Sequence, residues 1–283
     1  MEASKQESSS TTESSGYRLG GVTLRGDPPE FGRYIAHSVP ISLEGIDWES
    51  IPEHPLPEEV LRIISYMQDV ESHTVVFPYT VFSRQAVSDE IVGPFLTCWL
   101  YEEIMHGRAL AKFLDYAGRP VAGGKKKRTT AMDQVDRAIS SLLSRVWKDF
   151  LALHMTIGAA HECTTIHAYR RLITMNDHPQ LDVLLRRIVQ DEARHFSFYM
   201  WQAKRRLARP GVARTVRRLM DRFYVPVGVS HQPDELARWV TGALFDGEEG
   251  RAAANHVDST IAKLPGFGDA RLFVSWLERK VYN

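Results

Sequence analysis

The chain has 283 residues, of which 43% are hydrophobic and 25% are charged, a composition typical of a globular protein with a sizeable core. Lys and Arg together number 35, as do Asp and Glu, so the net charge favours no class of partner. No apolar run approaches the roughly 20 residues of a membrane-spanning helix, which predicts that the chain has no membrane span. Cys98 and Cys163 show no disulfide pattern and favour a reducing, cytoplasmic location.

The N-terminal part carries no helical pattern. Residues 1–16 are rich in Ser, Thr and Glu and lack the basic start and apolar stretch of a secretory signal, so they predict a disordered tail. Residues 17–56 contain several prolines and glycines, which predict an irregular leader that wraps around a larger domain.

Helical patterns begin at Pro57 and predict four long helices. They are expected at about 57–84, 88–117, 131–175 and 180–208. Ser88 is the expected N-cap of the second helix. Long helices joined by short connections predict an antiparallel four-helix bundle over residues 57–209.

Shorter helical patterns follow the bundle. They are expected at about 212–223, 234–245, 248–263 and 269–281. Residues 210–283 are therefore predicted to form additional C-terminal helices packed on the bundle. Strand patterns are weak throughout, so the predicted fold class is all-α.

Two E-x-x-H motifs stand on two of the long predicted helices. They are Glu103 with His106, and Glu192 with His195. Positions i and i+3 of a helix lie about 60° apart on one face, so each pair can hold one metal ion. A single E-x-x-H motif also occurs by chance on a solvated face. Two copies in apolar stretches favour a metal, because a buried carboxylate without a partner costs several kcal/mol.

A bundle that holds two metal ions takes one further glutamate from each remaining long helix. Glu162 is the only glutamate of the third predicted helix, and Glu71 lies on the first. The predicted ligands are Glu71, Glu103, His106, Glu162, Glu192 and His195. Such a carboxylate-rich site without thiolates favours two iron ions, with manganese as the alternative.

Several nearby residues leave other interpretations open. Glu71, together with Asp69, could instead stabilise the solvated side of its helix. Glu102 adjoins Glu103 but has no histidine three residues later. The other histidines of these helices are expected to support the ligands or to pack in the core; they are His73, His161 and His167.

At these motifs the sequence resembles the acyl-acyl-carrier-protein desaturases of the ferritin-like di-iron carboxylate superfamily. The first motif of that family is similar to E-E-N-R-H-G, and residues 102–107 read EEIMHG. The second is similar to D-E-K-R-H, and residues 191–195 read DEARH. The family has a threonine three residues after its third-helix glutamate, as Thr165 follows Glu162. The resemblance covers about residues 57–205 and implies a ferritin-like bundle.

One position departs from the family pattern. Plant-type desaturases place the first-helix glutamate four residues before a proline, and here Thr74 occupies that position relative to Pro78. Glu71 lies about one turn earlier. The resemblance therefore does not fix the first-helix ligand or the reaction.

The resemblance also implies a role for each site residue. Glu103 and Glu192 would bridge the two irons. The terminal carboxylate ligands would be Glu71 and Glu162, and the nitrogen ligands would be His106 and His195. Asp191 would hydrogen-bond a ligand imidazole, or else be a solvated helix acid. Thr165 would donate a hydrogen bond in the oxygen pocket, or else bond to its own helix.

The implied activity is a dioxygen-dependent desaturation of an aliphatic chain. The substrate would be carried by an acyl carrier protein or be a small molecule, electrons would come from a donor such as ferredoxin, and the protein would be a homodimer. The alternatives are a hydroxylase or amine N-oxygenase of the same superfamily, and a non-catalytic iron-binding protein. A radical-generating reductase subunit is disfavoured because Leu110 stands where those proteins have a tyrosine.

Two basic segments stand out from the neutral average. One is Lys125, Lys126, Lys127 and Arg128, and the other is Lys204, Arg205, Arg206, Arg209, Arg214, Arg217, Arg218 and Arg222. They predict a docking surface for an acidic carrier protein, or alternatively a solvated face. No nucleic-acid recognition motif accompanies them, so a nucleic-acid partner is not expected.

Overall fold

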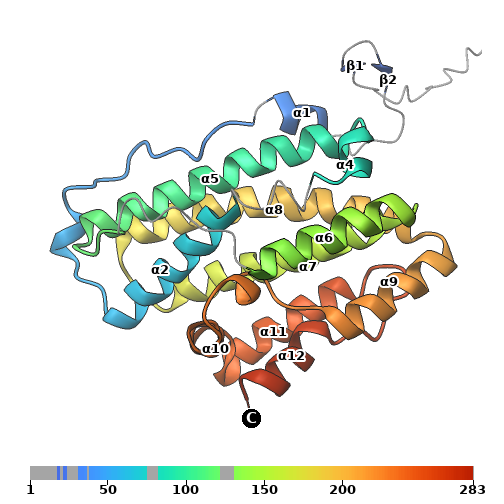
Figure 1. Ribbon diagram of the computed structural model, residues 1–283. Coiled ribbons are helices and arrows are strands. Elements are labelled where there is room, and N and C mark those ends of the chain that lie inside the picture. Colours follow the sequence, from blue (N-terminus) through green and yellow to red (C-terminus); the bar gives the residue numbers. More distant parts are fainter. Residues whose placement is uncertain are drawn as a thin grey trace, which may run out of the picture. The chain divides into compact units, whose positions relative to one another are not determined.

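The computed structural model describes residues 18–19, 22–23, 31–36, 38–74, 82–121 and 131–282 (Figure 1). The chain divides into two units, Met1–His37 and Ser38–Asn283. In the first unit, β1 (Arg18–Leu19) pairs antiparallel with β2 (Val22–Thr23), and α1 (Phe31–Ala36) follows. The predicted tail, residues 1–16, lies outside the described residues.

The second unit is built on four long helices, which confirms the predicted all-α bundle. They are α2 (Glu58–His73), α5 (Val92–Tyr116), α7 (Phe150–Thr174) and α8 (Pro179–Leu207). Helix α7 packs along α8, and α2 packs along α5. The core lies between these helices because each turns an apolar stripe inward, as Phe95, Leu110 and Phe113 do on α5.

The predicted end of the first helix, at about residue 84, is wrong, because residues 82–83 are not helical. Helix α2 ends at His73, and Pro78 lies outside the described residues. A separate helix, α4 (Arg84–Ser88), begins after Ser83, whose side chain accepts a hydrogen bond from the Ala86 N–H. The predicted N-cap of the next helix is also wrong. The Asp89 carboxylate, rather than Ser88, accepts hydrogen bonds from the N–H groups of Ile91 and Val92 at the start of α5.

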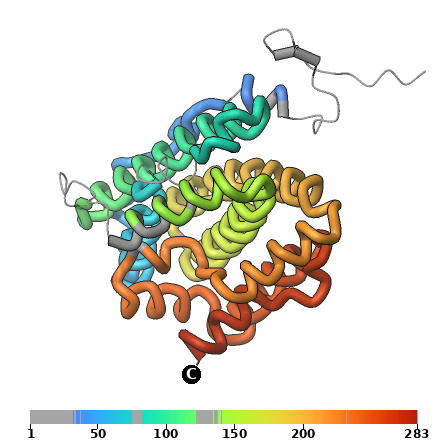
Figure 2. The backbone as a smooth tube through the Cα atoms, turned by 45° about the vertical axis from the view of Figure 1, so that its right-hand side comes forward, coloured from blue at the N-terminus to red at the C-terminus, as the bar shows by residue number. Residues whose placement is uncertain are grey.

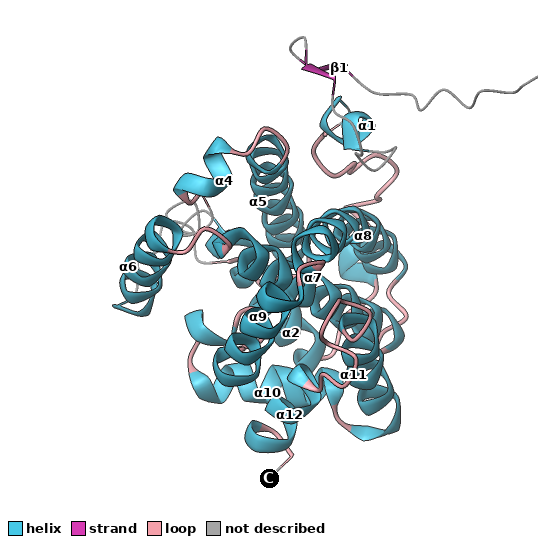
Figure 3. Ribbon diagram, turned by 90° about the vertical axis from the view of Figure 1, so that its right-hand side faces the viewer, coloured by secondary structure: helices cyan, strands magenta, loops and turns pink. Residues whose placement is uncertain are grey.

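The third predicted helix is two helices. Helix α6 (Ala131–Val146) ends before residues 147–149, and α7 starts at Phe150. The Gln85 amide donates to the carbonyl oxygens of Ser144 and Trp147, at 2.8 Å each. These two bonds satisfy carbonyls that a continuing helix would have used, so a contact from α4 stabilises the break. Figure 3 shows α6 at the edge of the second unit, beside α4.

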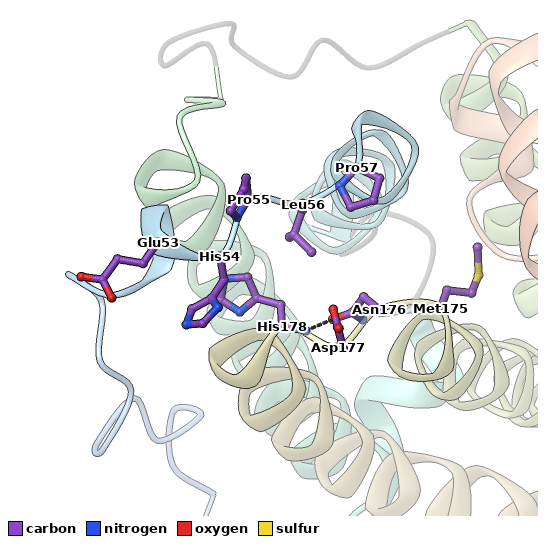
Figure 4. Close-up of a pocket in the computed structure, with 9 residues that line it drawn as sticks. All are labelled: Glu53, His54, Pro55, Leu56, Pro57, Met175, Asn176, Asp177 and His178. Carbon is purple, nitrogen blue, oxygen red and sulfur yellow. Dashed lines mark hydrogen bonds between the residues drawn. The ribbon is translucent and has the colours of Figure 1, made fainter.

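The start of α8 is fixed by a histidine. The His178 Nδ1 accepts hydrogen bonds from the backbone N–H groups of Gln180 and Leu181, at 3.2 Å each. Asn176 in turn accepts a hydrogen bond from the His178 N–H (Figure 4). His178 and His54 line a small cavity of about 330 Å³ there. Because its Nδ1 caps the helix, His178 serves the fold at this position.

The additional C-terminal helices are as predicted to within a few residues. They are α9 (Pro210–Phe223), α10 (Asp234–Phe245), α11 (Gly247–Ile261) and α12 (Leu272–Lys280), with the short 3-10 turn η3 (Val229–His231) between α9 and α10. Another 3-10 turn, η1 (Ile51–Glu53), lies before α2. Helices α9, α10 and α11 pack against α7, and they group together in Figure 2. Within the described part of the chain, no helix combines the length and apolar character needed to cross a membrane. The basic residues 125–128 lie outside that part.

Candidate metal centre

Six buried side chains from the four long helices meet in the middle of the bundle. Helix α2 supplies Glu71, α5 supplies Glu103 and His106, α7 supplies Glu162, and α8 supplies Glu192 and His195. Glu192 and both histidines have no solvent-exposed surface. The structure therefore brings together all six residues that the sequence singled out.

The six residues form two overlapping groups. One group is Glu71, Glu103, His106 and Glu192, and the other is Glu103, Glu162, Glu192 and His195. Within each group the potential ligand atoms lie within 4.8 Å of one another. Glu103 and Glu192 belong to both groups, so their carboxylates occupy the position from which a ligand contacts two neighbouring ions.

Both imidazoles turn the same nitrogen toward the carboxylates. The Nδ1 of His106 lies 3.2 Å from Glu192 Oε1, and the Nδ1 of His195 lies 3.0 Å from Glu103 Oε1. Their outward nitrogens contact two further acids: His106 Nε2 lies 3.1 Å from Asp191, and His195 Nε2 lies 2.7 Å from Glu102. Each outer carboxylate favours a proton on Nε2, which leaves the Nδ1 lone pair directed into the cluster.

The two carboxylates that belong to only one group each accept a hydrogen bond from another helix. The indole N–H of Trp99 donates to Glu162 Oε1 at 2.9 Å. The Tyr169 hydroxyl donates to Glu71 Oε1 at 2.5 Å. These bonds hold one oxygen of each carboxylate and fix the direction of the other.

The cluster contains more carboxylates than cationic groups. Burial, together with neighbouring carboxylates, raises the pKa values of Glu71, Glu103 and Glu162 above the ordinary glutamate value. Burial also opposes ionisation of Glu192, but the two histidines outweigh it and lower the pKa of Glu192. Burial alone would lower the pKa of His106, yet Asp191 and Glu192 raise it to about 9. A divalent cation would relieve this repulsion.

Three buried atoms at the centre of the cluster make close ion-pair contacts, at 3.0–3.2 Å, but no well-aligned hydrogen bond among the described residues. They are Glu103 Oε1, Glu192 Oε1 and His106 Nδ1. An orphaned buried polar atom costs roughly 1–3 kcal/mol, and proteins rarely leave several together. All three are ligand atoms for a hard or borderline metal ion. The buried cluster is therefore compatible with a metal site.

A cavity of about 1180 Å³ reaches the same cluster. Glu71, Glu103 and Glu162 line one part of it. Apolar residues of α6, α7, α9 and α10 line much of the remainder, including Leu142, Ile157, Met220 and Leu244. A largely apolar molecule can therefore lie beside the carboxylates, against mostly apolar walls.

The structure also places the two supporting residues expected from the resemblance. Asp191 contacts His106 and, through its other oxygen, Arg194 at 2.5 Å. Thr165 is half-buried and lines the cavity. Its neighbour Thr164 bonds back to the carbonyl of Ala160, whereas no such bond is found for Thr165 in the described residues.

Three residues around the centre have contacts with the cluster that the sequence did not predict. Glu102, Trp99 and Tyr169 each contact a residue of the cluster that lies more than 60 positions away in the chain. One signal for Glu102 was available, because an acid precedes the glutamate in both motifs: Glu102 before Glu103, and Asp191 before Glu192. Each preceding acid contacts the histidine of the opposite motif.

The other histidines take no part in the two groups. The His161 ring lies 3.0 Å from the carbonyl oxygen of Val225, and His167 packs against His256 with ring centroids 4.9 Å apart. His73 is buried near the end of α2.

Comparison of the chain with protein-family models, curated proteins and solved structures gives no match.

Proposed function

We propose that the chain is a di-iron oxidoreductase that uses dioxygen to desaturate an aliphatic chain held in the cavity beside the cluster. The observation that carries the proposal is the pair of overlapping Glu and His groups, which share Glu103 and Glu192 and lie next to an apolar cavity. Two iron ions bound there would supply the electrons and open coordination positions that dioxygen activation needs.

The protein residues have separate tasks in this proposal. Glu103 and Glu192 would hold both ions, since they belong to both groups, and Glu102 and Asp191 fix the orientation of the histidines. The apolar cavity walls keep water away from a reactive centre and hold an unreactive chain close to it. The Thr165 hydroxyl, which lines the cavity, is available to donate a hydrogen bond toward dioxygen.

The cavity also separates this proposal from iron storage, because storage requires no space for an organic molecule beside the metal. A hydroxylase or an amine N-oxygenase would use the same centre, and product analysis distinguishes these reactions from desaturation. An acyl carrier protein as the tether, ferredoxin as the electron donor and a homodimeric assembly stay predictions from the resemblance.

The first test is the iron content of the purified protein and its optical spectrum after anaerobic reduction and exposure to oxygen. We expect about two irons per chain, because the four long helices supply enough ligands for two ions. We also expect a transient absorption band after the reduced protein is exposed to oxygen. Glu103→Ala and His195→Ala should each lose most of the iron. Glu90→Ala, which removes an exposed glutamate before α5, is the matched control and should keep it.

Circular dichroism would show whether the variants remain folded. Iron content unchanged in both ligand variants would rule out this centre. Manganese rather than iron in the purified protein would change the assigned metal. Incubation of the reduced protein with oxygen and saturated aliphatic substrates, followed by mass spectrometry, would show loss of two hydrogens for desaturation and gain of one oxygen for hydroxylation.

A further inference from the structure

Apolar side chains are exposed around one edge of the large cavity. Ile139 and Leu142 of α6 are 51% and 61% exposed, and Phe223 at the end of α9 is 69% exposed. Val225 follows at 39%. All four residues line the cavity and are exposed, so they lie where it opens to the surface. We call these four residues the portal rim.

The apolar surface continues along α6. Val146, 71% exposed, lies one turn beyond Leu142. Five of the nine large hydrophobic residues that are exposed in the described part of the chain therefore gather here. Helix α6 packs against α4, α7 and η3, and these side chains stay exposed. Contiguous exposed apolar surface marks a binding surface for another molecule or for a membrane.

Positive charge accompanies the portal rim. Arg145 is exposed, lines the cavity and lies between Leu142 and Val146 along α6. Arg218 and Arg222 are exposed on successive turns of α9, next to Phe223. These three arginines have no ion pair with the described residues. The nearby acid Asp221 is already paired with Arg217 at 2.8 Å.

The basic segment at residues 204–222 has fewer positive charges available for an acidic protein than its composition implies. Several of its arginines already form ion pairs within the chain: Arg206 with Asp89, Arg209 with Asp149, and Arg217 with Asp221 and Asp269. Arg218 and Arg222, which have no ion pair with the described residues, are instead beside the exposed Phe223. If the partner were a purely acidic protein surface, the polar groups of that partner would lose water against the apolar side chains of the rim, which is unfavourable.

An anionic lipid surface matches both features. Exposed Leu, Ile and Phe side chains enter the boundary between headgroups and acyl chains, and arginines beside them bind lipid phosphates. We propose that the portal rim, with Arg145, Arg218 and Arg222, docks the protein on an anionic lipid surface and admits apolar substrate from the lipid into the cavity. This inference rests on the rim and the cavity and goes beyond the proposed oxidation.

The test is co-sedimentation of the full chain with vesicles of phosphatidylcholine alone and with vesicles of phosphatidylcholine and phosphatidylglycerol in equal parts. We expect binding to the anionic vesicles that weakens at high salt. The double variant Leu142→Ser with Phe223→Ser should bind at least about tenfold more weakly. Its matched control is Val39→Ser with Val87→Ser, which changes two valines that are 59% and 62% exposed elsewhere and should bind as wild type.

The charge contribution has its own pair of variants. Arg145→Gln with Arg222→Gln should lower binding to anionic vesicles, whereas Arg108→Gln with Arg238→Gln, at two exposed positions away from the rim, should not. Equal binding of rim and control variants, or no binding of wild type to either vesicle, would overturn the proposal.

Two other occupants of the rim would also overturn it. One is a second copy of the chain. In that case the wild type would be a dimer that does not bind vesicles, and the Leu142→Ser with Phe223→Ser variant would be a monomer. The other is an acidic acyl carrier protein that binds through the rim while vesicles do not. Iron content measured on the same preparations keeps this result separate from the proposed function, because serine at these exposed positions should leave the iron content unchanged.

Discussion

At the scale of single residues, every ligand that the centre presents at its edge is held by a side chain from another helix. Glu102 and Asp191 hold the two histidines. Trp99 holds Glu162, and Tyr169 holds Glu71. Such contacts restrict the rotamers of the ligands before any metal binds. Preorganisation of this kind commonly changes metal affinity by 10–100-fold.

Replacement of Glu102 tests this arrangement. In Glu102→Gln the amide oxygen can still accept the His195 Nε2–H, but the negative charge that makes the imidazole a stronger ligand is lost. We expect affinity for Mn²⁺, an air-stable probe, to fall about 10–100-fold while the helical content stays unchanged. Chelator competition measures the affinity.

Asp191→Asn is the companion change, because Asp191 contacts His106 in the corresponding position. It should weaken Mn²⁺ binding by a similar factor. The surface change Glu58→Gln is the control and should have no effect. If Glu102→Gln bound Mn²⁺ as tightly as wild type, the outer carboxylates would have no part in metal binding.

At the scale of helices, the ligand-bearing elements and the ligands themselves were predictable, because 3.6-residue periodicity and the E-x-x-H spacing are local in sequence. The break between α6 and α7 was not. Residues 147–149 contain neither glycine nor proline, and the contact that stabilises the break comes from Gln85, about 60 positions earlier. Trp99 and Tyr169 were missed for the same reason: their partners lie on other helices.

The close approach of α2 and α5 at Gly107 yields a prediction at this scale. A Cβ at Gly107 would lie 2.6 Å from Ser72 Oγ, 3.0 Å from the Ser72 backbone N and 3.3 Å from Glu71 Cβ. The Ser72 hydroxyl can rotate, but the backbone of α2 must shift. We therefore expect Gly107→Ala to destabilise the fold by about 1–2 kcal/mol, after the helix-propensity gain of about 1 kcal/mol. Denaturant unfolding measures this change.

The same shift moves Glu71, so Mn²⁺ affinity should fall as well. Gly211→Ala is the matched control, because a Cβ there meets no atom within 4 Å. It should leave metal binding unchanged and stabilise α9 slightly through the higher helix propensity of alanine. Equal stabilities and equal Mn²⁺ affinities for the two variants would contradict the close contact inferred at Gly107.

At the scale of the second unit, the bundle and the C-terminal helices contribute different parts of one arrangement. The four long helices carry the six clustered side chains, whereas α9, α10 and α12 complete the wall of the cavity together with α6. Neither set alone encloses the space beside the carboxylates. The buried charge that this arrangement creates also links metal binding to the stability of the whole fold.

Metal removal should therefore lower the stability of the protein, and by more as the pH rises. In the metal-free fold the pKa values of Glu71, Glu103 and Glu162 are raised, so the folded chain binds more protons than the unfolded chain above the ordinary glutamate pKa. The corresponding stability is present below that pKa and is lost as the pH rises through the folded-state values. Bound cations reverse this trend, because their affinity increases when the ligands lose protons.

We expect the difference in Tm between metal-loaded and chelator-treated protein to widen from about pH 5 to about pH 8. Metal at 100 times its Kd adds about 2.7 kcal/mol, or roughly 5–10 °C for a chain of this size. Differential scanning fluorimetry with Mn²⁺ or with chelator measures it. Glu103→Ala with His195→Ala should lose the metal-dependent difference, because it removes one ligand from each helix of the two motifs. An equal Tm with and without metal at every pH would show that the buried carboxylates are stabilised by the protein alone.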